Sequence, residues 1–144
     1  MLGSEKSAKN PKNDSLAKSA LLAMVLDSNI LIGYLNGDRT LIRQVDAWRQ
    51  QGQFLIISTV TLTEVLSLAT LSVIKLRQYE QYLRTFQIVS PEAAIAEEAA
   101  RLRRKYPISI TDALIGATAL LWQVPLVTRD ADFERSKELE LIWP

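Results

Sequence analysis

Apolar and polar residues follow one another along this chain in blocks whose spacing predicts strands and helices in turn. Residues 24–26 form an apolar run of strand length, and the apolar positions within 30–35 lie on one face of a helix. Asp27 therefore stands at a corner between a buried strand and a helix. Ligands bind at the carboxyl ends of strands in open α/β sheets, so this corner suits chemistry. The simpler alternative is that Asp27 only caps the helix.

The same alternation continues through the rest of the chain. Apolar runs predict further strands, the last of them at the edge of the sheet, at 54–57, 88–89, 125–128 and 139–143. Helical spacing predicts helices at about 40–51, 60–68, 72–86, 90–105 and 109–121. Strands that alternate with helices predict an α/β protein with a three-layer α/β/α fold, in which helices cover both faces of a mostly parallel sheet of four to five strands.

Polar residues at the predicted helix starts indicate how these helices begin. Thr40 is a suitable N-cap for the helix that Gly52 closes, and Ser90 is one for the helix whose first turn holds Pro91. Ser109 opens the last long helix. We expect these side chains to accept hydrogen bonds from the free amides at the helix starts.

Residues 1–23 differ in composition from the rest of the chain. They are rich in Ser, Lys, Asn and Ala and show little apolar periodicity before Leu21. We therefore expect a mobile N-terminal extension over 1–23, followed by a single domain over 24–144. The alternative is a short helix over 16–22 that docks on the domain.

The composition restricts the chemistry available to the chain. It has 144 residues, of which 48% are hydrophobic and 23% charged, as in an ordinary globular domain, and it contains no Cys and no His. Disulfides, thiolate nucleophiles, zinc sites of Cys or His and histidine bases are therefore excluded. Carboxylates with oxygen-preferring cations remain for hydrolysis. No apolar run reaches the length of a membrane span or a secretory signal, so we expect a cytoplasmic protein.

Charge is distributed unevenly along the chain. Four of the 17 Lys and Arg and two of the 16 Asp and Glu lie in 1–23, which leaves 13 basic and 14 acidic residues in the domain. Contact with a nucleic acid would then depend on local basic residues. The candidates are Arg101, Arg103, Arg104, Lys105 and Arg129. The first four end a helix, where cations are also favoured without any ligand.

Acidic residues recur at corresponding places of the predicted fold. They follow the first strand, lie in the helix after the second, open a helix and follow the fourth strand: Asp27, Glu64, Asp112 and Asp130 or Asp132. Because these places face one end of a parallel sheet, the carboxylates can converge. Each also has a local explanation, and Glu64 can close a capping box with Thr61. Asp112 can do so with Ser109, and Asp130 can form a turn.

Converging carboxylates suit a cation site. Acids within about 4 to 6 Å of one another raise each other's pKa until a cation neutralises them. Mg²⁺ and Mn²⁺ prefer oxygen ligands and leave positions for phosphate oxygens, and a pair of such ions can assist phosphodiester hydrolysis without histidine. Asn29, Thr111 and Thr128 stand beside the acids and are candidates for orienting them.

Four segments, in this order, resemble the PIN-domain ribonucleases, and most closely the VapC-type toxins of bacterial and archaeal toxin/antitoxin modules. The segments are LDSNILI at 26–32, STVTLTEVL at 58–66, TDALIGATA at 111–119 and LVTRDADF at 126–133. Each alone is unspecific, whereas the ordered set is quite specific. The resemblance covers about 25–143.

The resemblance implies an α/β/α fold and Mg²⁺- or Mn²⁺-dependent cleavage of RNA. It assigns metal binding to Asp27, Glu64, Asp112 and Asp130, with Asp132 as a fifth candidate. It also implies homodimers and inhibition by a cognate antitoxin that inserts a segment into the active-site groove. Two features depart from the family's pattern. The first Asp of the family usually lies within a few residues of the start, whereas some two dozen residues precede Asp27 here. The acid near the end is doubled, at Asp130 and Asp132, so the fourth ligand is ambiguous.

Two other functions compete with this one. A PIN-like module that only binds RNA or protein would have no need to concentrate four acids at one end of the sheet. A receiver-like phospho-acceptor domain needs its key Asp after a mid-chain strand and a Lys after a late one, whereas Ser58, Ser90 and Thr128 follow these strands. The sequence therefore predicts a metal-dependent endoribonuclease, with the binding module as the alternative.

Overall fold

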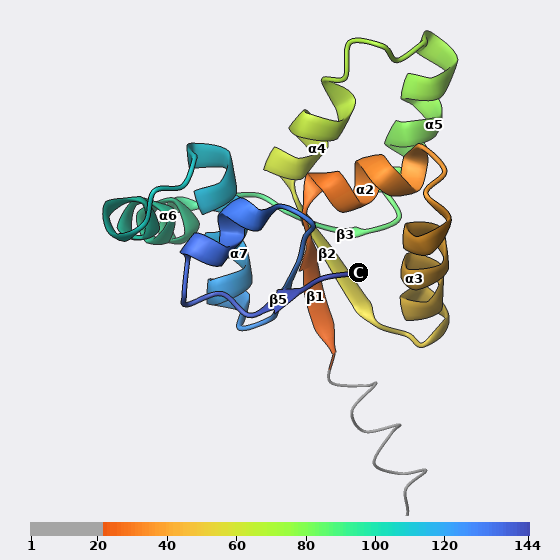
Figure 1. Cartoon of the computed structure of the whole chain (residues 1–144). Helices are drawn as coiled ribbons and strands as arrows, with labels where there is room; N and C mark the ends of the chain where they lie inside the picture. The colour runs from red at the N-terminus through yellow and green to blue at the C-terminus, as the bar shows by residue number, and fades with distance from the viewer. Residues whose placement is uncertain (1–21) are drawn as a thin grey trace, which may run out of the picture.

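Five short parallel strands form the central sheet of the computed structural model, which describes residues 22–144 (Figure 1). The strands are β1 (Ala23–Leu26), β2 (Phe54–Ser58), β3 (Gln87–Val89), β4 (Leu126–Val127) and β5 (Leu141–Ile142). Their spatial order is β3-β2-β1-β4-β5, and every neighbouring pair is parallel. The predicted parallel sheet is confirmed, with β5 at its edge.

Six α-helices and one 3₁₀ helix connect the strands. They are α2 (Ser28–Leu35), α3 (Arg39–Gln50), α4 (Thr59–Leu66), α5 (Val73–Leu83), α6 (Ala93–Lys105), α7 (Ile110–Trp122) and the 3₁₀ helix η1 (Ala131–Arg135). Helices α2 to α5 lie on one side of the sheet, and α6 and α7 lie on the other (Figure 1). The predicted arrangement of three layers is therefore confirmed. In residues 22–144 no helix is long and apolar enough to span a bilayer.

The alternation of side chains along β1 divides the core into two parts. Met24 and Leu26 pack with the residues of α2 to α5, whereas Val25 packs on the opposite face against α7. All three side chains are at most 1% exposed. A strand that is buried on both faces must be apolar at every position, which explains the continuous apolar run before Asp27.

The chain changes direction across the sheet between β1 and β4. From β1 it moves outward through β2 to β3, and then returns to place β4 on the other side of β1. In such open sheets the helices on either side of this point diverge, and a crevice opens at the carboxyl ends of the two strands. Asp27 directly follows β1, and Thr128 directly follows β4. The two segments are hydrogen-bonded, because the Asp27 amide donates to the Val127 carbonyl at 3.0 Å.

Two predicted helix caps are wrong. Asp38, not Thr40, caps α3, because its Oδ1 accepts from the amides of Thr40 at 3.0 Å and Leu41 at 3.1 Å. Ser90 lies too early to cap α6. That helix begins at Ala93 after Glu92, whose side chain makes no capping hydrogen bond.

The predicted N-terminal extension lies mostly outside the described residues. So does the alternative helix over 16–22, of which only Leu22 is described. From Leu22 onward the chain belongs to the sheet, because the Leu22 carbonyl accepts from the Phe54 amide at 3.2 Å and β1 begins at the next residue.

Candidate metal centre

Asp27 lies at the end of β1 and is only 3% exposed. Its Oδ1 accepts from the Ser28 amide at 2.8 Å, so it does cap α2 as the simpler alternative proposed. Its Oδ2 accepts from the Thr128 hydroxyl, also at 2.8 Å. A capping Asp needs no partner from a strand 101 residues away. The second hydrogen bond therefore fixes the Asp27 carboxylate against the segment that leaves β4.

Thr128 and Asn29 hold the segment that carries Asp130. The Thr128 Oγ1 accepts from the Asp130 amide at 3.0 Å and from Asn29 Nδ2 at 3.3 Å. The Asn29 Oδ1 accepts in turn from the Arg129 amide at 3.2 Å. Thr128 thus contacts both Asp27 and Asp130, and Asn29 contacts Thr128 and the backbone of Arg129. Thr111 is different, because its hydroxyl contacts Ser109 Oγ at 3.2 Å.

Three carboxylates form the tightest acidic group of the described chain. Asp112 lies in the first turn of α7, Asp130 precedes η1, and Asp132 lies in its first turn. One oxygen from each lies within 4.8 Å of the other two, a spacing that could hold one cation. Asp130 Oδ1 also accepts from the Asp132 amide at 2.9 Å, so the predicted turn is present and brings the two acids together.

Glu64 is half-buried on α4 and does not close a capping box with Thr61. The cap of α4 is Ser58, whose Oγ accepts from the Val60 amide at 3.1 Å, so Thr61 and Glu64 lie inside the helix. By contrast, Ser109 caps α7 as predicted and accepts from the Asp112 amide at 3.1 Å. The Oε1 of Glu64 is buried and finds no hydrogen-bond partner among residues 22–144. An orphaned carboxylate oxygen is costly, and a cation would satisfy it.

Burial and repulsion between charges raise the pKa of three of the acids, Asp27, Glu64 and Asp112. Burial raises the pKa of Asp27 to about 6, against the hydrogen bonds from Thr128 and Ser28, and the charge of Glu64 adds to the effect. Burial, and then the charge of Asp27, raise the pKa of Asp112 to about 6. The pKa of Glu64 is raised by burial and by the charge of Asp112. Asp27 and Glu64 lie outside the group of three, but the charges of all these acids act on one another.

We expect the metal-free protein to gain stability when the pH falls from 7 to 5. Because the folded-state pKa values of Asp27 and Asp112 are raised from 3.8 to about 6, the folded protein holds protons that the unfolded chain has lost. Stability from such groups is present at low pH and lost as pH rises through about 6. The full shift of buried Asp27 corresponds to about 3 kcal/mol, and a gain of about 1 to 3 kcal/mol is expected.

Urea denaturation in EDTA at pH 5 and pH 7 measures this difference. The pKa values of Asp38, Glu98 and Glu138 are lowered by arginine partners, so their contribution is lost only at more acidic pH. An unfolding free energy that is equal at both pH values, or smaller at pH 5, would contradict the raised pKa values.

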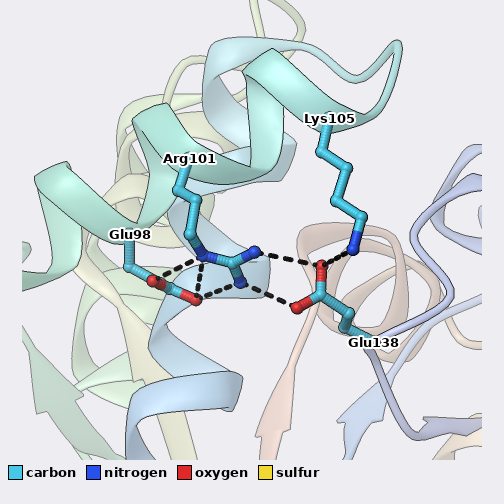
Figure 2. Close-up of polar contacts among 4 residues, drawn as sticks. All are labelled: Glu98, Arg101, Lys105 and Glu138. Carbon is cyan, nitrogen blue, oxygen red and sulfur yellow. Dashed lines mark hydrogen bonds and ion pairs between the residues drawn. The ribbon is translucent and has the colours of Figure 1, made fainter.

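The basic residues predicted to contact RNA lie in different environments. Arg101 pairs with Glu98 at 2.6 Å and Glu138 at 2.8 Å, and Lys105 lies 3.6 Å from Glu138 (Figure 2). Figure 2 shows that these four side chains join α6 to the segment before β5. The ion pairs with Glu98 and Glu138 therefore explain Arg101 and Lys105 without any contact to RNA.

The other three candidates divide between the last turn of α6, which holds Arg103 and Arg104, and the turn after β4, which holds Arg129. Arg103 Nε donates to the Ile108 carbonyl at 3.2 Å. Arg104 is exposed. The Arg129 guanidinium pairs with Asp38 at 2.8 Å and donates from Nε to the Pro144 carbonyl at 3.3 Å. Its side chain is thus bound to α3's cap, although its backbone lies in the site.

Sequence reasoning missed three residues at this end of the molecule. The Ser28 side chain lowers the pKa of the Glu64 carboxyl, which burial and the charge of Asp112 raise. Asp38 holds Arg129, and Arg135 pairs with Asp132 at 3.4 Å. Only the position of Ser28, directly after Asp27, gave a local signal. The other two act on partners that the sequence pattern does not place beside them.

Solved structures of other proteins share this fold. The first is a toxin–antitoxin complex from Klebsiella pneumoniae, 31% identical, with a TM-score of 0.71 over 83% of this chain and 95% of that one. VapBC2 from Rickettsia felis, bound to a DNA fragment from its promoter, has 20% identity and a TM-score of 0.75 over 85% and 99%. VapBC-5 from Mycobacterium tuberculosis has 26% identity and a TM-score of 0.60 over 85% and 98%. No curated protein matches the chain.

The fold and the site together define an α/β domain that gathers carboxylates at the switch point of a parallel sheet. Residues 24–139 match the PIN domain. The chain therefore belongs to the PIN domain family, and its structural neighbours are toxins of VapBC-type toxin–antitoxin complexes. The resemblance found in the four sequence segments is confirmed.

Proposed function

We propose that this PIN domain is an endoribonuclease that hydrolyses RNA phosphodiester bonds with Mg²⁺ or Mn²⁺. The observation that supports this most strongly is the group of Asp112, Asp130 and Asp132, whose oxygens lie within 4.8 Å of one another beside Asp27. A chain without His or Cys has few other groups for phosphodiester hydrolysis. Mg²⁺ and Mn²⁺ prefer the oxygen ligands that such a group of carboxylates offers.

The site fits a divalent cation because the pKa values of Asp27 and Asp112 are raised and Glu64 has an orphaned oxygen. Asp112 and Asp130 would hold the cation, with Asp27 and Glu64 completing the quartet and Asp132 as a further ligand. When bound, Mg²⁺ or Mn²⁺ supplies positive charge and Lewis acidity toward water and phosphate oxygens. Thr128 keeps the Asp27 carboxylate in one orientation, and Asn29 and Thr128 together keep Asp130 beside it.

We further propose that the protein is the toxin of a type II toxin/antitoxin pair in the cytoplasm. Support comes from the toxin–antitoxin complex from Klebsiella pneumoniae, in which one chain is 31% identical to this one. The expected partners are a cognate antitoxin, an RNA substrate and a second copy of the chain in a homodimer. A PIN-like module that binds without cutting remains the alternative.

Cleavage of a mixed pool of structured and single-stranded RNAs tests the proposed activity. We expect cutting with Mn²⁺ or Mg²⁺ and none with EDTA, because four mutually repelling acids cannot hold a phosphodiester without a cation. Products are separated on a denaturing gel and sequenced to give the cut sites. Protein that is folded, free of antitoxin and unable to cut any RNA in the pool would favour the binding module.

A further inference from the structure

We propose that Arg135 binds a backbone phosphate of the RNA at the edge of the acidic site. This inference rests on the proposed ribonuclease function and adds a substrate contact that neither the sequence pattern nor the family match assigns. Arg135 is the last residue of η1, three positions after Asp132. Its place is therefore fixed by the same short helix that carries an acid of the site.

The guanidinium of Arg135 is held from two sides. Its Nη1 donates to the Pro107 carbonyl at 3.1 Å, and its Nη2 lies 3.4 Å from Asp132 Oδ1. Pro107 lies in the loop between α6 and α7, just before the helix whose first turn holds Asp112. These contacts keep the positive charge of Arg135 beside the acidic group and next to the start of α7.

Arg135 keeps free binding capacity in this position. Its side chain is 53% exposed, and an arginine has five N–H donors, of which the contacts in residues 22–144 occupy Nη1 and Nη2 on one side each. The planar fork of a guanidinium matches two oxygens of a phosphate. A phosphodiester chain that approaches the site meets four or five carboxylates, so it needs a cation at the edge in addition to any ion between them.

Two arginines that the sequence suggested for RNA contact are already occupied by other partners. Arg101 binds two glutamates, and Arg129 binds Asp38 and the Pro144 carbonyl. A phosphate would have to displace short ion pairs of 2.6 to 2.8 Å at these residues. At Arg135 it would compete only with a longer, exposed pair, and such pairs contribute little to stability. The geometry thus favours Arg135 over Arg101 and Arg129, two of the five basic residues that the sequence suggested.

A different role for Arg135 gives a different result on substitution. If Arg135 only neutralises Asp132, its removal changes the acidic group and leaves RNA affinity as it was or raises it, because the acids lose a competitor for cations. If Arg135 binds phosphate, its removal lowers RNA affinity and makes it less sensitive to salt, because fewer counterions are released.

The test compares Arg135→Gln, Arg135→Lys and Arg101→Gln, all in an Asp112→Asn background that prevents cleavage. The probe is a mixed-sequence single-stranded RNA with a fluorescein label, and binding is followed by anisotropy over a series of salt concentrations. We expect Arg135→Gln to lower affinity about tenfold and to reduce the slope of log affinity against log salt by about 0.7. Arg135→Lys should keep most of the slope, and Arg101→Gln should match the unchanged background.

Equal affinity and slope for Arg135→Gln and its background would overturn the proposal, as would a larger loss for Arg101→Gln. Circular dichroism of each variant shows whether it is folded. The cleavage assay with the unchanged chain separates the two levels of inference. If the unchanged chain cuts RNA in a metal-dependent way and Arg135→Gln binds RNA as its background does, only the phosphate contact is refuted. If the unchanged chain neither cuts nor binds RNA, both proposals are refuted.

Discussion

Asp112→Asn is expected to abolish RNA cleavage while the protein stays folded. Asp112 belongs to the group of three acids, and burial raises its pKa to about 6. The substitution removes a negative charge that would attract a cation and that repels the neighbouring acids. Loss of a charged group at a reacting centre lowers rates on the order of 10³-fold. Asparagine keeps the size of the side chain and the amide that Ser109 caps.

The same substitution should raise the thermal stability of the metal-free protein. Removing a carboxylate that its neighbours repel raises the free energy of unfolding by about 1 kcal/mol. Part of this gain is lost, because a negative charge in the first turn of a helix is itself stabilising. Differential scanning calorimetry with EDTA and with Mn²⁺ measures both effects. We expect Mn²⁺ to raise the Tm of the unchanged chain by binding the folded state, and to raise that of Asp112→Asn much less.

Glu97→Gln is the matched control, because Glu97 is an exposed acid on α6. It should cleave RNA and respond to Mn²⁺ like the unchanged chain. If Asp112→Asn unfolds, or if it cleaves as fast as Glu97→Gln, Asp112 serves the helix and not the chemistry.

Phe133→Ala is expected to destabilise the protein by about 3 to 5 kcal/mol. Phe133 is completely buried and packs with Val25 of β1 and Ile115 of α7. It also lies in η1 between the acids and Arg135, so its ring anchors the helix that positions them. Urea denaturation gives the loss of stability, and the rise in Tm with Mn²⁺ shows whether the acids still act together.

Phe54→Ala provides the comparison, since Phe54 is 49% exposed at the start of β2. It should cost less than about 1 kcal/mol and leave the response to Mn²⁺ unchanged. A loss at Phe133 as small as that at Phe54 would mean that η1 is not anchored by its aromatic ring.

The sequence predicted the sheet because apolar runs and helical spacing are local signals. The run that ends at Leu26 is apolar at every position because β1 is buried on both faces. The acids at the strand ends could be recognised for a related reason. Parallel strands must present their carboxyl ends on one side, so Asp27 and Asp130 had to lie near each other once the topology was given.

Interactions between distant residues were not predictable in this way. Asp38 pairs with Arg129 across 91 positions, and Arg101 pairs with Glu138 across 37. The spacing of apolar residues gives no information about such pairs. Arg101 and Arg129 are therefore both candidates for RNA contact on the sequence alone. The wrong cap at Thr40 has a similar origin, because Asp38 and Thr40 are both good capping residues and the start of α3 decides between them.

The pairing of β1 with β4 determines when the acidic site can first exist during synthesis. Val25 and Leu126 are register partners, yet almost the whole domain is translated between them. Contacts this distant in sequence form late, after the local helices and the β1–β2 pair. Asp27 and Glu64 leave the ribosome long before Asp130, so a nascent chain carries the first acids without the last. The complete site therefore appears only when the final strands close the sheet.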